Sequence, residues 1–169
     1  MYTYLLDTYK ENDLVYDRYS KGKLESKLAY DGQFKPYFEY IADCLKKYSS
    51  QRDKQKGEAF VHGFTLAMTS QNKFYRPISE LDNDGGYADI FLSPLRDIYK
   101  DMVDSYIIEL KYCKSQTTDE QVKKLFEEAS AQISRYAESD MVREAVKTTK
   151  LHKLVAIYRG AEMVVCEEI

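Results

Sequence analysis

Three charged residues stand inside the two segments with the strongest strand character. Asp89 lies in YADIFL, and Glu109 and Lys111 lie in YIIELKY. An isolated buried charge is very costly, so these side chains must be paired, or must meet solvent or a ligand. Two carboxylates, completed by waters and phosphate oxygens, are a usual ligand set for Mg²⁺. The metal could activate a bound water and neutralise charge on a phosphoryl group, while the Lys111 ammonium orients the water or stabilises that charge.

Strand alternation predicts which of these side chains lie together. Residues two apart in a strand point to the same face, so Glu109 and Lys111 are expected to project with Ile107. By itself, a Glu-x-Lys triplet is more often an ordinary ion pair on an exposed strand face. Asp89 favours the metal site, because the turn signal DNDGG (82–86) predicts a hairpin that brings the strand of Asp89 beside the next strand.

The elements that would position these residues follow from periodicity and turn signals. The expected helices cover 36–48, 50–68 and 117–139, and the expected strands cover 73–81, 87–92, 105–112, 151–160 and 161–169. Residues 1–13 have helical periodicity, and 19–34 are expected to form a short helix or a loop. The order is helices followed by β-β-β-α-β-β, which predicts an α/β or α+β sandwich with a mixed sheet.

Two local signals add detail to this arrangement. Pro77 cannot donate a backbone hydrogen bond, so its strand is expected at a sheet edge or a bulge. Thr118 with Gln121 predicts a capping box at the start of the helix 117–139.

The pattern Asp89-x19-Glu109-x-Lys111, placed on strands with a helix before and after, resembles the PD-(D/E)XK nuclease superfamily. Ala88 stands where the family name records a Pro, a position at which replacement is frequent. The resemblance implies a restriction-endonuclease-like core, a mixed sheet flanked by helices, over residues 50–169. It also implies hydrolysis of nucleic acid, with DNA as the first expectation, using Mg²⁺ or Mn²⁺.

The same resemblance implies roles for further residues. Glu58 is similar to the acidic residue that many members contribute to the metal, and Gln132 with Tyr136 is similar to the QxxxY element of one large branch. The implied metal ligands are Glu58, Asp89, Glu109 and the backbone carbonyl of Leu110. Lys111 is expected to position or activate water, and Gln132 to orient substrate or water.

Candidate substrate contacts lie on the helix that follows the Glu-x-Lys strand. Tyr136, Arg135 and Lys123 are the residues expected to contact the nucleic acid, although a solvated helix face is the default explanation of the two cations. His62 lies four residues after Glu58, hence on the same helical face, and is either a partner of the site or a histidine with a structural role. His152 is expected to be structural.

Six segments also resemble one bacterial group in which such a domain follows an AAA-type ATPase-like domain in the same polypeptide. They are GEAFVHGF, GGYADIFL, YIIELKY, AQISRYA, LHKLVAIYRG and EMVVCEEI. Residues 1–49 are then expected to be a helical extension or linking region of a longer protein.

Composition limits the alternatives. A formal charge of −3 over 169 residues argues against a simple DNA-coating protein. No run of about 18 apolar residues is present, so no membrane partner is expected. Three cysteines without metal-binding spacing favour reduced thiols and a cytoplasmic location. The rival interpretation is a non-catalytic recognition or regulatory module attached to the ATPase domain, and the oligomeric state is left open.

Overall fold

The computed structural model describes residues 18–48, 57–83, 86–138, 140–146 and 148–169. Within these ranges the elements follow one another as α2 (Arg18–Asp31), α3 (Lys35–Tyr48), α5 (Glu58–Thr69), β1 (Tyr75–Asn83), β2 (Gly86–Pro94), β3 (Asp104–Cys113), α6 (Asp119–Tyr136), α7 (Asp140–Ala145), β4 (Lys150–Arg159) and β5 (Glu162–Glu168). The expected helix at 1–13 and the expected start of a helix at residue 50 lie outside the described residues. None of the described helices is long and apolar enough to cross a bilayer.

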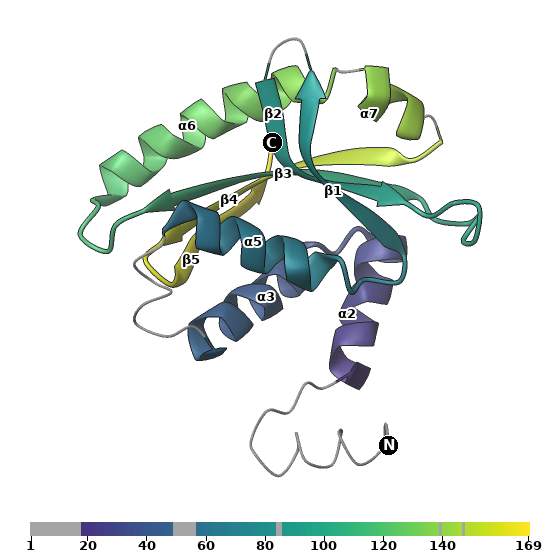
Figure 1. Ribbon diagram of the computed structural model, residues 1–169, viewed down its shortest axis with the longest axis horizontal. Helices are drawn as coiled ribbons and strands as arrows, with labels where there is room; N and C mark the ends of the chain where they lie inside the picture. Colours follow the sequence, from purple (N-terminus) through teal and green to yellow (C-terminus); the bar gives the residue numbers. More distant parts are fainter. Residues whose placement is uncertain (1–17, 49–56, 84–85, 139, 147) are drawn as a thin grey trace.

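One mixed sheet carries all the strands of the described ranges, in the order β1-β2-β3-β4-β5. β3 pairs with β4 in parallel, and the other neighbours pair antiparallel. The parallel pair requires a crossover connection, which α6 and α7 supply. The sheet is flanked by helices on both faces (Figure 1), so the predicted mixed α+β fold is confirmed.

The hairpin that leads into the sheet centre has the predicted form. β1 and β2 pair from Tyr75↔Pro94 to Asn83↔Gly86. β1 is an edge strand, as the presence of Pro77 predicted. β3 is the middle strand, and seven consecutive residues from its start are buried. Glu109 and Lys111 are therefore carried by the central, largely buried strand of the sheet.

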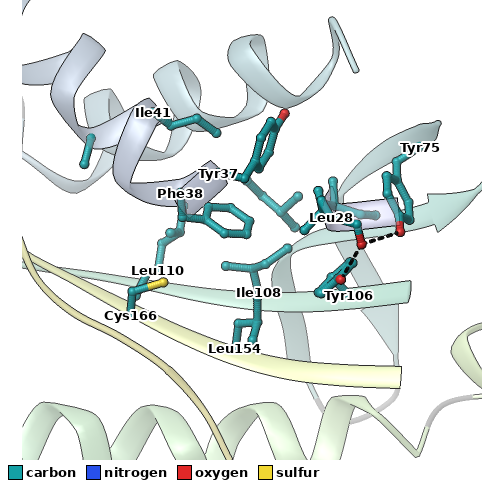
Figure 2. Packing of buried hydrophobic residues seen from close by; sticks show 14 of the residues in the cluster. Leu28, Tyr37, Phe38, Ile41, Tyr75, Tyr106, Ile108, Leu110, Leu154 and Cys166 are labelled. Carbon is teal, nitrogen blue, oxygen red and sulfur yellow. Dashed lines mark hydrogen bonds between the residues drawn. The ribbon is translucent and has the colours of Figure 1, made fainter. Parts of the chain in front are cut away.

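The two faces of the sheet have separate apolar cores. α6 and α7 cover one face, above the sheet in Figure 1, and α2, α3 and α5 cover the other. Phe91, Ile107 and Val155 pack against Ala129 and Ile133 on the α6 face. On the opposite face the alternate strand residues Ile108, Leu110 and Leu154 belong to a second core. That core also contains Phe38 and Ile41 of α3 (Figure 2). This separation confirms the alternation predicted for β3.

At 19–34, where a short helix or a loop was expected, the chain forms most of the 14-residue helix α2, and tertiary contacts hold it. Its last turn leaves backbone carbonyls without helical partners. The carbonyl oxygen of Leu28 accepts a hydrogen bond from the hydroxyl of Tyr106 at 2.6 Å, and a longer one from Tyr75 at 3.5 Å (Figure 2). Gly32, with φ of 66°, then takes the left-handed conformation that ends the helix. Two tyrosines of the sheet thus attach α2 to the core.

α6 begins as its sequence predicts. The side chain of Thr118 accepts a hydrogen bond from the backbone of Gln121, and the Gln121 side chain accepts one from the Thr118 backbone. The side of α6 that faces the sheet carries the buried residues Val122, Ala129 and Ile133. The capping box fixes where α6 starts, and the buried stripe fixes which side of the helix meets β3. The short helix α7 was not expected from the sequence.

Candidate active site

Asp89 and Glu109 lie where the pairing between β2 and β3 ends. The paired residues are Leu92↔Tyr106, Phe91↔Ile107 and Ile90↔Ile108. One further step in this register sets Asp89 opposite Glu109, and residues directly opposite in an antiparallel pair share a face. At that step a side-chain contact joins the strands, because Asp89 Oδ2 accepts the backbone N–H of Leu110 at 2.7 Å. The hairpin therefore brings the Asp89 carboxylate to β3 beside Glu109.

The Leu110 carbonyl points to the same place. In a strand, the N–H and C=O groups of one residue are directed to the same neighbouring strand. Because the N–H of Leu110 reaches Asp89 on the β2 side, its carbonyl oxygen also faces β2 beyond the last paired residues. Its direction agrees with the ligand role expected for it.

A chain of hydrogen bonds links β3 to α6. Lys111 Nζ donates to Glu109 Oε1 at 2.7 Å and to Gln132 Oε1 at 3.2 Å. Gln132 Nε2 in turn donates to the hydroxyl oxygen of Tyr136 at 2.7 Å. Both ends of the Gln132 amide are thus engaged, one with the lysine and one with a buried tyrosine. This geometry fixes the Lys111 ammonium beside the Glu109 carboxylate.

Burial sets the electrostatics of Glu109. Its side chain is 0% exposed, against 20% for Lys111. Burial, followed by the charge of Asp89, raises the pKa of Glu109 to about 7, against the opposing effect of Lys111. Its second oxygen, Oε2, is buried without a hydrogen-bond partner among the described residues. An unpartnered buried carboxylate oxygen is expensive unless another ligand meets it.

Lys111 remains a cation in this setting. Burial opposes its charge, but the hydrogen bond to Glu109 and the carboxylates of Glu109, Asp89 and Glu58 together raise its pKa above the ordinary value. A lysine held protonated is a donor and a positive charge, and is unsuited to accepting a proton. Of its three hydrogens, two are directed to Glu109 and Gln132.

The charges and donor atoms fit a hydrated divalent cation. With all groups ionised, Glu58, Asp89 and Glu109 set three negative charges against the single positive charge of Lys111, and a divalent ion would neutralise the excess. Across the described ranges, no three His, Cys, Asp or Glu side chains form a metal-binding cluster. The directly available ligands are then two carboxylates and a carbonyl, which suits Mg²⁺ because it retains several waters.

Glu58, an expected metal ligand, lies at the start of α5. It is the first residue of α5, preceded by Gly57 with φ of 60°, and its side chain is exposed. Its charge nevertheless contributes to raising the pKa of both Glu109 and Lys111. Glu58 is thus close enough to influence the site electrostatically.

The three expected substrate contacts occupy different positions on α6. Tyr136 is 5% exposed and packs in the core, with its hydroxyl on Gln132. Arg135 is exposed, one turn from Gln132. Lys123 is also exposed, but nine residues before Gln132 is about 13 Å along the helix and on its opposite side. The structure therefore gathers Tyr136 and Arg135 near the site and leaves Lys123 apart; all three roles stay predictions.

The two histidines have different partners: His62 lies on α5 and His152 on β4. His62 Nε2 lies 3.0 Å from the backbone oxygen of Asp89. His152, 3% exposed, has its ring nitrogens 2.7 Å from Asp104 Oδ1 and 2.9 Å from Glu168 Oε1, and it stacks on Tyr106. That cluster ties together the start of β3, the start of β4 and the end of β5, which agrees with the structural role expected for His152.

The mixed sheet, with Asp89 at the end of a pairing and Glu109-x-Lys111 on the neighbouring central strand, defines a restriction-endonuclease-like fold with a nuclease-type arrangement of charges. The chain belongs to the PD-(D/E)XK nuclease superfamily, whose family model matches residues 56–168. Membership supports a nuclease-like function. No curated protein and no solved structure matches the chain.

Proposed function

We propose that this protein is a metal-dependent phosphodiesterase that hydrolyses nucleic acid, with DNA as its substrate and Mg²⁺ or Mn²⁺ as its cofactor. The observation that carries the proposal is the juxtaposition of Asp89, Glu109 and Lys111 where β2 and β3 separate. The buried Glu109 Oε2, which has no hydrogen-bond partner among the described residues, supports a cation as a ligand of this carboxylate.

In this proposal Asp89, Glu109 and the Leu110 carbonyl hold the metal directly, and Glu58 assists. A divalent ion bound there lowers the pKa of water and neutralises charge developing on the phosphoryl group. Lys111, kept protonated by its carboxylate neighbours, uses its remaining hydrogen to orient water or to stabilise the phosphoryl oxygens. Gln132 orients the Lys111 ammonium, and Tyr136 holds Gln132.

Arg135 and Lys123 would bind phosphates of the substrate from the exposed side of α6. Such contacts are salt-dependent and independent of sequence, so Arg135→Ala and Lys123→Ala should raise KM and leave kcat nearly unchanged. Because Lys123 lies on the other side of α6 from Gln132, the larger effect is expected for Arg135.

The experiment is a cleavage assay with plasmid, single-stranded DNA and RNA, in Mg²⁺ or Mn²⁺ and in EDTA. Asp89→Asn and Lys111→Met should each lower the rate at least about a hundredfold. Matched controls are Asp97→Asn and Lys100→Met, which change exposed residues of the loop before β3. Cleavage that survives both site substitutions would refute the assignment, and cleavage of RNA alone would refute the choice of DNA.

The resemblance described above supports two further parts of the proposal. The nuclease domain, residues 50–169 with α2 and α3 packed against it, would work beside an AAA-type ATPase-like domain of the same polypeptide, in the cytoplasm. The second candidate function is a non-catalytic recognition or regulatory module of that ATPase. The formal charge of −3, which gives no overall attraction for nucleic acid, favours this alternative. Calorimetry with Mn²⁺ distinguishes the two, because the non-catalytic module should give no heat.

A further inference from the structure

His62 connects α5 to the strand that carries Asp89. Its Nε2 lies 3.0 Å from the backbone oxygen of Asp89 and 3.3 Å from the hydroxyl oxygen of Ser79. Ser79 lies on β1 and is paired with Ile90, the residue that follows Asp89. One imidazole nitrogen therefore contacts β1 and β2 together, at the level of the candidate site.

The chemistry of the acceptor assigns the tautomer of His62. A backbone carbonyl oxygen can only accept a hydrogen bond, so Nε2 must carry the hydrogen and donate it to Asp89. The Ser79 hydroxyl, farther away, shares the same hydrogen as a second acceptor. The polar Ser79 side chain thus suits the position beside His62 Nε2. An apolar side chain there would lie against the N–H edge of the imidazole.

Asp89 is thereby held at two points. His62 holds its backbone carbonyl, and the Leu110 N–H on β3 holds its carboxylate at 2.7 Å. The last regular pair between β2 and β3 is Ile90↔Ile108, so Asp89 lies one residue beyond the paired part of β2. Where the pairing stops, side-chain contacts such as these determine the direction of the backbone, and the direction of the backbone determines where the carboxylate lies.

We propose that His62 is a positioning residue, which fixes the backbone at Asp89 so that its carboxylate stays at the metal-binding position. The proposal rests on the proposed function, in which Asp89 is a metal ligand. Residues that hold a metal ligand in place without touching the metal typically affect metal affinity by about 10- to 100-fold.

The test compares His62→Leu with His62→Gln. Leucine fills a similar volume and has no donor, whereas the amide nitrogen of glutamine lies at about the same distance from the backbone as Nε2 and can donate to the same carbonyl. In calorimetry, His62→Leu should weaken Mn²⁺ binding about tenfold, and His62→Gln should restore most of it. Equal loss of Mn²⁺ affinity in both variants would overturn the proposal.

A metal-free measurement separates this proposal from the proposed function. The Leu110 amide is protected by Asp89, so its hydrogen exchange in EDTA should be at least about tenfold faster in His62→Leu and near the wild-type rate in His62→Gln. Tyr106→Phe, a destabilised variant on the same strand, controls for general loosening and should not accelerate Leu110 selectively. Faster exchange with no Mn²⁺ binding to the wild type would refute the proposed function and support the positioning of Asp89. Unchanged exchange at Leu110 would overturn the positioning role.

Discussion

The buried Glu109 carboxylate should make the metal-free protein lose stability as the pH rises. Its pKa is about 7 in the folded protein, against 4.5 for an ordinary glutamate, with burial as the largest cause. Between these values the unfolded chain releases the proton while the folded protein still retains it. The contribution is therefore fully present below about pH 4.5 and is lost as the pH passes through about 7. The shift corresponds to about 3 kcal/mol.

Glu109→Gln isolates this effect, because an amide has nearly the shape of a protonated carboxyl group and does not titrate. In EDTA the variant should exceed the wild type in free energy of unfolding by less than about 1 kcal/mol at pH 5 and by about 3 kcal/mol at pH 8. Subtracting one protein from the other at each pH removes the contributions of all other titrating groups, provided that they are unaffected by the substitution.

Urea unfolding followed by far-ultraviolet circular dichroism suits a chain with 16 tyrosines and no tryptophan. Glu127→Gln, an exposed change on α6, is the matched control and should give a difference that does not vary with pH. A pH-independent difference for Glu109→Gln, or a variant less stable than the wild type at pH 8, would refute the reasoning about burial.

Four smaller predictions concern metal binding and the scaffold. Mn²⁺ at a hundredfold excess over its dissociation constant should raise the free energy of unfolding of the wild type by about 2.7 kcal/mol, and that of Asp89→Asn far less; equal gains would place the ion elsewhere. Tyr106→Phe removes the short hydroxyl contact to α2 and should cost about 1 kcal/mol in urea unfolding. Thr118→Ala removes the cap of α6 and should cost a similar amount, about 1 kcal/mol. Gly160→Ala should destabilise by about 1–2 kcal/mol because φ is 63°, whereas Gly63→Ala, in open space within a helix, should stabilise by up to about 1 kcal/mol; effects of the same sign would contradict both arguments.

Local rules were sufficient to predict where Asp89, Glu109 and Lys111 lie on the sheet. The period of a strand assigned Glu109 and Lys111 to one face, and the hairpin assigned Asp89 to the adjacent strand; both are confirmed by the sheet register and the two cores. Each of these expectations depends on neighbours in sequence or on one tight turn. The same holds for Thr118, whose capping contacts span three residues.

Which side chains of α2 and α5 are buried depends on tertiary contacts, and the sequence pattern predicted it less well. α2 buries Lys21 and Glu25, which form an ion pair at 3.2 Å, so its buried side does not follow an apolar pattern. On α5 the apolar Ala67 is exposed, whereas Thr65 is buried. A threonine gives no clear signal of burial in a hydrophobic pattern, so only the packed structure shows that Thr65 faces the core.

Distances across the sheet could not be predicted either. Nothing in the spacing of His62 and Asp89 indicates that an imidazole on α5 meets a backbone oxygen on β2. Similarly, the helical repeat predicts that Lys123 and Gln132 lie on opposite sides of α6. It does not predict which side faces the site, which follows from the contact between Gln132 and Lys111.

The tyrosine contacts to Leu28 have a consequence for how the chain can be divided. The region that matches the family begins at residue 56, yet α2 and α3 supply Leu28, Phe38, Ile41 and other side chains of the core that covers one face of the sheet. A fragment cut at the family boundary would present that apolar face to water. It would also leave the Tyr106 hydroxyl without its acceptor. The unit recognised by sequence similarity is thus smaller than the packed unit, and expression or domain-transfer experiments should retain the chain from at least residue 18.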